Sequence, residues 1–341
     1  MLYGFWVANY IAFNGDVLRE LAAEFLTLAE KQGSTVPLMI GHRIMGISLT
    51  CTGDIEEGRA HLDRSIALYN PVQHRPLATR FGQDVGVTVL SYRSWAQWLF
   101  GHPNAALADA DHVLKDARDI GQAATLMYGL YHTSFIPQIH CGNYTRATVE
   151  VEELVALADE KSSLFWKALG MLNRGYLLTL NGDASDAAQT ITFGRTAFGS
   201  TRATVFAPFY LSYLARAHAE LGHFDEAWQC LNEAMTAMET TGERWCEAEV
   251  HRMAGEIALM SPQPDAAKAE AYFERALVVA RKQQAKSWEL RTAMSMARLW
   301  RDQGKRDEAR DLLAPVYGWF TEGFDTLDLK EAKALLDELH A

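Results

Sequence analysis

A repeat of about forty residues is the feature that most restricts how this chain can fold. Turn positions between two apolar helical segments recur at Gly15, Gly53, Gly101, Gly142, Gly182, Gly222 and Gly304, with Pro264 in the remaining slot. The successive intervals are 38, 48, 41, 40, 40, 42 and 40 residues. A period kept through most of a chain is typical of a solenoid, in which each unit packs on its neighbours. It is not typical of the two globular domains that a length of 341 residues alone would suggest.

Each repeat unit is predicted to be a pair of helices. Before the turn comes an apolar segment with a period of 3.6 residues, such as residues 206–221. After the turn, small residues recur seven apart, as at Ala227 and Ala234. Small side chains at this spacing let the two helices approach closely. Glycine at the turn supplies the left-handed backbone conformation that ends the first helix.

The last residues predict a capping helix over about 326–340. Its apolar stripe consists of Leu329, Ala332, Leu335, Leu336 and Leu339, and the remaining positions are mostly charged. Such a helix covers the apolar face that the last repeat would otherwise expose. We therefore expect an all-α fold, a right-handed superhelix of about eight helix hairpins over about residues 1–320 plus this helix. The whole of 1–341 is predicted to be a single domain.

The repeat unit resembles the tetratricopeptide repeat. The segment "GHFDEAWQCLNEA" at 222–234 carries its pattern of glycine, an aromatic or apolar residue, acidic residues, and two alanines seven apart. The first unit departs from the pattern, because Glu20 occupies a small-residue position. The units are also longer than the usual length of about thirty-four residues, which implies extended helices or linkers.

Three further segments narrow the resemblance. Residues 79–107, residues 242–259, and residues 285–300 followed by 322–339 are similar to the C-terminal tetratricopeptide region of large bacterial signalling proteins. In those proteins the region follows a STAND-type ATPase, which follows a class III adenylate/guanylate cyclase or a winged-helix DNA-binding module. The similarity begins near residue 3 and reaches the C-terminus. This chain has no GxxxxGK[ST] phosphate loop and no cyclase core, so the resemblance implies a sensing or scaffolding role and not those activities.

Charge and composition exclude several classes of partner. A net charge of −11 disfavours sequence-independent nucleic-acid binding and docking on an anionic membrane, since both need a basic surface. The four cysteines are scattered and are interpreted as reduced and buried. The apolar N-terminus lacks a basic region and a cleavage site and is interrupted by Asn9 and Asn14, so we expect a cytoplasmic protein.

The search for catalytic or metal-binding motifs yields only weak candidates. Glu247 and His251 are four residues apart and could form an acid–base pair, but this spacing is more typical of a pair on a helix surface. His132, His140 and Cys141 do not converge on a tetrahedral ion without a further ligand. A helical-barrel glycosidase with paired carboxylates is disfavoured by the short repeats. We expect no enzyme activity, no metal and no cofactor, and interpret most of the nine tryptophans as core residues.

The concave face of the superhelix is the predicted binding site. In the tetratricopeptide frame, the first helix of each pair lines that face. The inward positions select Arg43, Tyr92, Trp95, His132, Asn173, Tyr176, Tyr213, Arg216, His251, Arg291 and Arg298. Tyrosine, tryptophan and arginine dominate interface hot spots, so the set favours a binding groove. The alternative is a wide groove with a wet, mixed lining.

Local charge adds a hint about the partner. Residues 281–310 hold nine Lys or Arg and four Asp or Glu, a local charge of +5. A basic end on an acidic solenoid would favour an acidic peptide or the acidic face of another domain. A solvated helix face is the alternative reading of the same charges.

These observations lead to two hypotheses about function. The first is a non-enzymatic interaction and regulatory module, whose concave groove binds a protein segment or a partner domain of an ATPase/cyclase signalling system. The second is a sensor of a small ligand, bound between first helices near Tyr92, Trp95, His132 and Tyr176, that changes the shape of the superhelix. An unrecognised helical-barrel enzyme is a third and weaker alternative.

Overall fold

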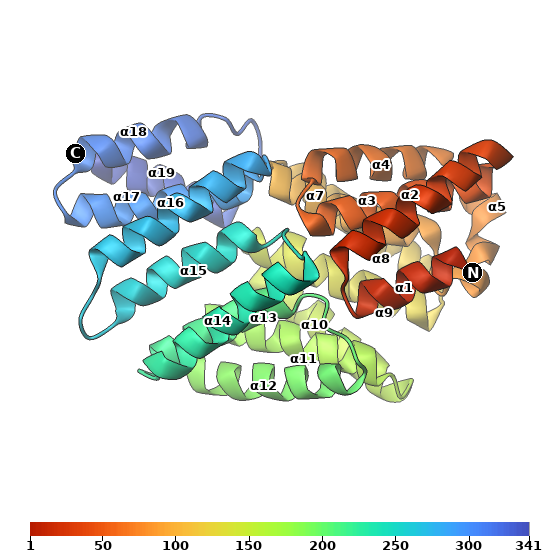
Figure 1. The fold of residues 1–341 in the computed structure, drawn as a ribbon, viewed down its shortest axis with the longest axis horizontal. Helices are drawn as coiled ribbons and strands as arrows, with labels where there is room; N and C mark the ends of the chain where they lie inside the picture. The colour runs from red at the N-terminus through yellow and green to blue at the C-terminus, as the bar shows by residue number, and fades with distance from the viewer. Residues whose placement is uncertain (341) are drawn as a thin grey trace.

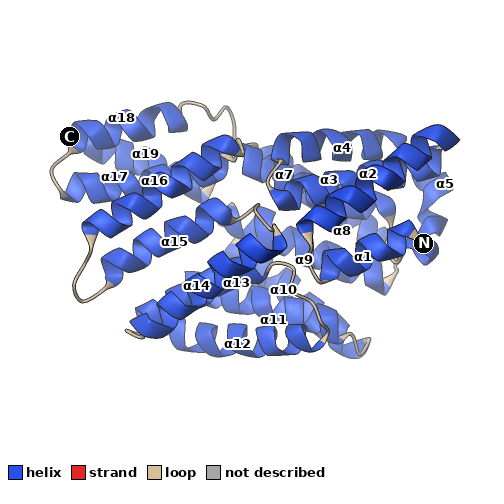
Figure 2. Cartoon of the chain, in the orientation of Figure 1, coloured by secondary structure: helices blue, strands red, loops and turns tan. Residues whose placement is uncertain are grey.

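The computed structural model of the chain describes residues 1–340 (Figure 1). Within these residues every regular element is helical and no strand occurs (Figure 2). The prediction of an all-α fold is therefore confirmed. None of the helices in this part of the chain has both the length and the apolar character that crossing a bilayer requires.

Eight helix hairpins follow one another along the chain, as the repeat predicts. They are α1 (Leu2–Ile11) with α2 (Gly15–Gln32), α3 (Thr35–Thr52) with α4 (Ile55–Leu68), α7 (Val85–Phe100) with α8 (Pro103–Ile120), α9 (Ala123–Thr133) and η2 (Ser134–Gln138) with α10 (Tyr144–Glu160), α11 (Leu164–Leu180) with α12 (Ala184–Ser200), α13 (Ala207–Glu220) with α14 (Phe224–Thr241), α15 (Glu247–Met260) with α16 (Ala266–Lys282), and α17 (Lys286–Asp302) with α18 (Arg306–Tyr317). We number these hairpins one to eight.

Two segments lie outside the hairpins. The long connection between the second and third hairpins forms the short helices α5 (Pro71–His74), η1 (Arg75–Leu77) and α6 (Ala78–Phe81). The predicted capping helix is α19 (Leu327–His340), and its apolar stripe from Leu329 to Leu339 is buried. This stripe packs on residues of the eighth hairpin, including Leu290 and Leu313, in one hydrophobic cluster.

The turns and the small-residue columns form as predicted, with one exception. The six turn glycines from Gly53 to Gly304 have positive φ angles, which a glycine adopts without steric cost. Gly15 instead begins α2, and the side chain of Asn14 caps that helix by accepting a hydrogen bond from the Val17 amide. Ala227 and Ala234 are fully buried, which fits their predicted role in close helix packing.

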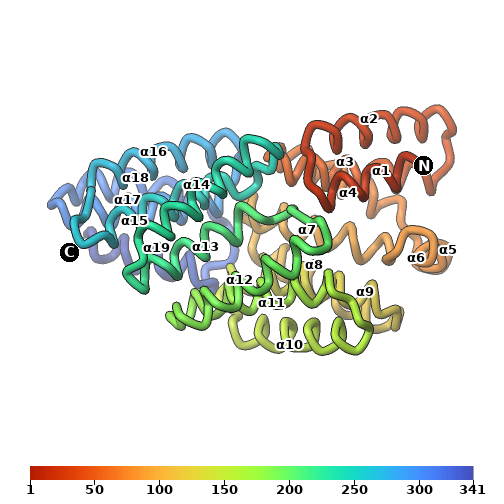
Figure 3. Tube along the Cα trace, turned by 60° about the horizontal axis from the view of Figure 1, so that its bottom comes forward, coloured from red at the N-terminus to blue at the C-terminus, as the bar shows by residue number. Residues whose placement is uncertain are grey.

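The superhelix is wound so tightly that its second turn touches its first (Figure 3). The end of the first helix in each of the first four hairpins meets the chain five units further on. The Thr204 amide donates to the Ile11 carbonyl over 2.9 Å, and the Arg244 amide donates to the Cys51 carbonyl over 2.9 Å. The third hairpin meets the eighth where Ser287 donates to the Trp98 carbonyl, and the fourth meets α19 where the Leu327 amide approaches the Cys141 carbonyl at 3.4 Å.

The surroundings of the turn glycines show the same contact between the two superhelical turns. A Cβ atom at Gly101 would lie 2.6 Å from the Trp319 ring, and one at Gly142 would lie 2.8 Å from Cβ of Leu327. The corresponding turns at Gly182, Gly222 and Gly304 have no atom within 4 Å of that position. Only the first four turns are therefore covered by a later part of the chain.

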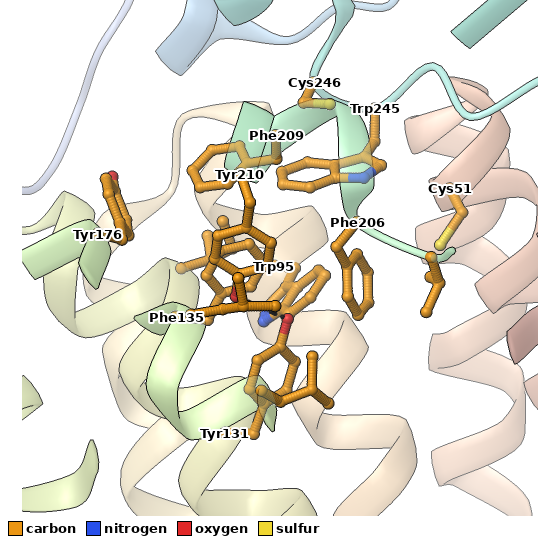
Figure 4. Close-up of a cluster of buried hydrophobic side chains, with 14 of the residues drawn as sticks. Cys51, Trp95, Tyr131, Phe135, Tyr176, Phe206, Phe209, Tyr210, Trp245 and Cys246 are labelled. Carbon is orange, nitrogen blue, oxygen red and sulfur yellow. Dashed lines mark hydrogen bonds between the residues drawn. The ribbon is translucent and has the colours of Figure 1, made fainter. Parts of the chain in front are cut away.

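Aromatic side chains fill the middle of the superhelix where the two turns meet (Figure 4). The ring centroid of Trp95, from the third hairpin, lies 5.7 Å from that of Trp245, which precedes the seventh hairpin. Phe209 of the sixth hairpin stacks on Trp245 with a centroid distance of 5.3 Å. Phe135 lies in the π-helical turn η2, which contains Pro137, and packs edge-on against Phe209 at 4.9 Å. We call these buried rings, with Phe206 and Tyr210, the aromatic core.

Candidate functional site

The structure divides the eleven predicted groove residues into several groups. Tyr92, Trp95, Asn173, Tyr176 and Tyr213 are buried in or beside the aromatic core. The open groove predicted for these positions is therefore not present, because the second superhelical turn fills it. Of the four residues predicted to surround a small ligand, Tyr92, Trp95 and Tyr176 are therefore buried by packing, whereas His132 lines a cavity.

The other six residues lie around this filled centre. Arg43 and His132 line a cavity beneath α1 near the N-terminus. Arg216, Arg291 and Arg298 line a polar pocket toward the C-terminus. His251 lines neither the cavity nor the polar pocket, and its ring is buried.

A cavity of about 460 Å³ lies beneath α1, and we call it the α1 cavity. One wall is α1 itself, and the others come from α3, α6, the end of α9, the start of α11 and the segment before α13. The contribution of α1 consists of Tyr3, Gly4, Trp6, Val7, Tyr10 and Ile11. A volume in this range suits a small organic ligand.

Polar tips of aromatic residues fix α1 over the cavity. Trp6 donates from its indole nitrogen to Ser48 over 2.9 Å, and the Tyr3 hydroxyl donates to the Phe81 carbonyl over 3.1 Å. The Tyr10 hydroxyl is hydrogen-bonded to that of Tyr92. Tyr3, Trp6 and Tyr10 are spaced three and four residues apart, so they share one helix face. This spacing was a signal in the sequence that pointed to an inward-facing α1, and it was missed.

The charged groups of the α1 cavity are all positive. Arg43 and Arg80 are among its lining residues, and neither Asp nor Glu is. Most of the remaining lining is apolar or aromatic, including Ile47, Phe165 and Leu169. Nothing in the lining itself neutralises the two guanidinium groups.

Arg43 is the more deeply placed of the two arginines. Its side chain comes from the middle of α3, and only 3% of the residue is exposed. Its Nε and Nη1 atoms are buried without a hydrogen-bond partner among the described residues. The guanidinium lies over the Tyr3 ring, with Cζ 5.7 Å from the ring centroid. A buried guanidinium without a carboxylate is costly, because its desolvation is not repaid by an ion pair.

His132 supplies the second unpartnered polar group of the α1 cavity. Its ring stacks on Tyr128 at 4.0 Å, and Nδ1 lies 2.8 Å from the Tyr128 carbonyl. Nδ1 therefore carries the hydrogen and donates it, since a carbonyl can only accept. Burial lowers the pKa of His132 to about 3, so the ring is neutral at pH 7. Nε2 is then a hydrogen-bond acceptor, and it has no partner within residues 1–340.

A second concavity, of about 360 Å³, is lined by charged residues of the last hairpins, and we call it the Arg216 pocket. Its charged residues form pairs with one another. These pairs are Arg216 with Glu220 at 2.8 Å, Arg252 with Glu256 at 3.2 Å, Arg298 with Glu331 at 2.8 Å and Arg291 with Asp328 at 3.9 Å.

The Arg216 pocket is therefore balanced in charge and not basic. The local charge of +5 counted over residues 281–310 omits the carboxylates of α19. Asp328, Glu331 and Glu338 come from that helix and pair with Arg291, Arg298 and Arg301. A preference for an acidic partner, expected from the sequence, loses its support here.

A buried network of charges adjoins the Arg216 pocket. Glu249 is fully buried and accepts hydrogen bonds from Arg252 and from the Tyr213 hydroxyl at 2.7 Å each. Burial alone would raise the pKa of Glu249, but the guanidinium groups of Arg252 and Arg291 hold it well below its usual range. Glu249 is thus an ionised structural residue with all its partners in the protein.

The weak candidates for chemistry include the buried residues His140, Cys141 and His251, and both ring nitrogens of His251 lack a hydrogen-bond partner within residues 1–340. Nε2 of His251 lies 4.0 Å from Glu247, too far for a hydrogen bond, and burial lowers the pKa of the imidazole to about 4. His140 accepts a hydrogen bond from Arg291. It does not line the α1 cavity, whereas His132 does. Cys141 is buried near α19, and burial raises the pKa of its thiol. None of these residues belongs to a cluster of three potential metal ligands in the described chain.

Comparison with known proteins agrees with this architecture. The tetratricopeptide-repeat family model matches residues 208–232 and 290–315, which lie in the sixth and eighth hairpins. No curated protein matches the sequence. The chain therefore contains two segments that match tetratricopeptide repeats, within an all-α solenoid of tetratricopeptide-like fold.

Solved structures of similar fold cover most of the chain. A Rap protein complexed with Competence and Sporulation Factor superposes with a TM-score of 0.62 at 12% identity, over 95% of this chain and 81% of that one. The apo form of RapI superposes with a TM-score of 0.52 at 12% identity, over 92% of this chain and 96% of that one. The apo form of the quorum sensor NprR from B. thuringiensis superposes with a TM-score of 0.52 at 13% identity, over 89% of this chain and 81% of that one. At these identities the likeness concerns the fold alone. None of these proteins is described as a cyclase or an ATPase, so that part of the resemblance stays a prediction.

Proposed function

We propose that this chain is a non-enzymatic, cytoplasmic regulatory module that binds a small organic ligand in the α1 cavity. The observation that carries the proposal is the pair of unpartnered polar groups, on Arg43 and His132, in a cavity whose other walls are mostly apolar or aromatic. Buried polar groups in native proteins are nearly always paired. Seven other residues of the described chain also have unpartnered buried atoms, but only Arg43 and His132 bring them together at the lining of one cavity, where a ligand would supply the partners. The Rap protein of similar fold, which is described as a complex with a factor, is consistent with a binding role.

Binding would affect more than the cavity. Its lining joins α1 to α9, α11 and Phe206, and Phe206 belongs to the aromatic core where the two superhelical turns meet. A ligand that contacts these elements together favours the arrangement in which they are close. Ligand binding would therefore stabilise the closed superhelix, and this is the physical basis for a regulatory role.

Thermal unfolding tests the proposal. The probes are decanoate, decanol and decylammonium, each titrated below its micelle concentration at pH 7.5. A ligand that binds only the folded chain raises the melting temperature in a saturable manner. We expect this for at least one of the three probes. If none of them raises the melting temperature, the cavity does not bind a small apolar ligand and the proposal fails.

A second candidate function concerns the Arg216 pocket. Arg216 and Arg298 keep 34% and 40% of their side chains exposed, so their ion pairs are open to exchange. A partner segment that offers both signs of charge fits this balanced pocket better than a purely acidic one. Following the resemblance stated above, the proposed partner is a domain of an ATPase/cyclase signalling system.

The test of the second candidate is a pull-down with a folded Arg216→Glu/Arg298→Glu double variant beside the wild type. A partner retained by the wild type at low salt, and lost in the variant and at high salt, supports the Arg216 pocket as its site. Equal retention by both proteins contradicts it.

A further inference from the structure

We propose that the ligand of the α1 cavity is an amphipathic anion, a carboxylate attached to an apolar chain or ring system, whose charge is bound by Arg43. This inference rests on the proposed function and specifies the chemical class of the ligand. It follows from three properties of the cavity: the sign of its charge, the unmet hydrogen bonds of Arg43, and the apolar character of its walls.

The sign of the charge excludes a cationic ligand and favours an anionic one. Two arginines line the cavity, and neither Asp nor Glu does. Arg43 forms no ion pair with a carboxylate of residues 1–340, unlike Arg252 and Arg291, which share Glu249. Beside the buried guanidinium of Arg43, the repulsion of a bound ammonium group is strong, and the attraction to a carboxylate is equally so.

The hydrogen-bonding capacity of Arg43 points to the same class. A guanidinium has five N–H donors and no acceptor, so its partner must accept. Two of its three nitrogen atoms, Nε and Nη1, have no partner and are covered by protein, so a ligand oxygen reaches them when the Arg43 side chain turns toward the cavity that it lines. A carboxylate has two acceptor oxygens that match this donor group, and charge-assisted hydrogen bonds of this kind are about twice as strong as neutral ones.

The walls of the cavity define the rest of the ligand. Trp6, Val7, Ile47, Phe165 and Leu169 present aliphatic and aromatic surface on several sides. A free inorganic anion would leave this surface without contact, whereas an alkyl chain or an aromatic ring would bury against it. The volume of about 460 Å³ accommodates a ligand of this size. The acceptor Nε2 of neutral His132 adds a place for a hydroxyl or amide N–H on the same ligand.

The experiment compares probes that differ only in their head group. Dissociation constants of decanoate, decanol and decylammonium are measured by isothermal titration calorimetry at pH 7.5 with the wild type, Arg43→Met and Arg64→Met. Arg64 is an exposed arginine of α4 that does not line the cavity, so Arg64→Met is the matched control for the change in net charge. We expect the wild type and Arg64→Met to prefer decanoate to decanol by at least about tenfold, the scale of a lost charged hydrogen bond. Arg43→Met should lose this preference while its affinity for decanol stays the same.

Different results separate this inference from the proposed function. If decanol or decylammonium binds the wild type as tightly as decanoate does, the cavity binds ligands but the anionic class is wrong. If Arg43→Met and Arg64→Met keep the same preference for decanoate, Arg43 does not recognise the charge. If no probe binds, the proposed function itself fails. Arg43→Gln provides a second neutral variant, and circular dichroism establishes that each variant is folded.

Discussion

The guanidinium of Arg291 donates a hydrogen bond to Nδ1 of His140 over 2.7 Å, although the two residues are 151 positions apart. His140 ends the first helical segment of the fourth hairpin, and Arg291 lies in the first helix of the eighth. The same guanidinium is 3.7 Å from Glu249 and 3.9 Å from Asp328. One side chain therefore links the first superhelical turn to the second.

Replacing this side chain is predicted to weaken the fold strongly. In Arg291→Met, His140 and Asp328 lose a cationic partner, and Glu249 keeps Arg252 and the Tyr213 hydroxyl. Removing one member of a buried charge cluster costs about 3 kcal/mol of unfolding free energy. Arg298→Met is the control, because Arg298 is paired with Glu331 but exposed, and exposed pairs contribute about 1 kcal/mol or less. Urea denaturation measures both. Equal losses in the two variants would mean that Arg291 does not hold the two turns together.

Two turn glycines provide a matched test of how the superhelix closes. Gly142 and Gly182 have φ angles of 83° and 84°, so alanine is equally strained at both. Only at Gly142 would the new Cβ meet another atom, 2.8 Å away on Leu327. Gly142→Ala should therefore lose about 1–3 kcal/mol more unfolding free energy than Gly182→Ala, the usual cost of overpacking. Chemical denaturation of both variants decides it. Identical losses would contradict the packing of α19 on the fourth turn.

A buried carboxyl group predicts how stability depends on pH. Glu243 accepts hydrogen bonds from the Phe206 amide and the Trp245 indole nitrogen, and it forms no ion pair with a cationic side chain of the described residues. Burial raises the pKa of Glu243 to about 8, and these hydrogen bonds offset the effect only in part. In the unfolded chain the pKa of a glutamate side chain is about 4.3. Between these two values the folded chain holds a proton that the unfolded chain releases, so the contribution of Glu243 to stability falls as pH rises toward 8.

Glu243→Gln cannot titrate and isolates this effect. We expect the unfolding free energy of the wild type to fall relative to Glu243→Gln as the pH is raised from 5 to 8, with no further change above that range. Urea denaturation at pH 5, 7 and 9 follows the difference. A difference that is constant over this range would show that the Glu243 carboxyl titrates normally in the folded chain.

Local features of the fold were predictable from the sequence, because they depend on short-range patterns. The turn glycines from Gly53 to Gly304, the alanine columns and the stripe from Leu329 to Leu339 all occupy the expected places. The closure of the superhelix was not predictable, because it depends on the small rotation between successive hairpins, which adds up over five units. No pattern within one repeat specifies that rotation.

The candidate site was predicted only in part for the same reason. Arg43 and His132 were selected as inward-facing residues, and both line the α1 cavity. Tyr92, Trp95 and Tyr176 were selected by the same rule, yet they are buried where the two turns meet. Helix register predicts which side chains point inward, but only the long-range packing determines which of them remain beside empty space.

The absence of a counter-ion for Arg43 has a consequence for stability. Arg43→Met removes a buried charge without leaving another charge unpaired, so the ligand-free protein should keep its stability or gain about 1 kcal/mol. Arg291→Met should change stability in the opposite direction, although both variants replace an arginine of a first helix by methionine. Urea denaturation without ligand tests this. A loss of about 3 kcal/mol in Arg43→Met would mean that the residue serves the fold and not a ligand.

The most direct test of the α1 cavity as a binding site is to fill it without harming the fold. Gly4 lies in α1 at the cavity, and no atom lies within 4 Å of the position that a Cβ would occupy. Gly199 in α12 is equally unobstructed but does not line the cavity, so Gly199→Leu is the matched control. Both substitutions replace a helical glycine and should raise stability by about 0.5–1 kcal/mol.

The measurement is the affinity of each variant for decanoate by isothermal titration calorimetry. We predict that the affinity of Gly4→Leu for decanoate is at least about tenfold lower than that of the wild type, because the new side chain occupies part of the cavity. Gly199→Leu should bind decanoate like the wild type. Unchanged binding by Gly4→Leu would contradict a ligand site beneath α1.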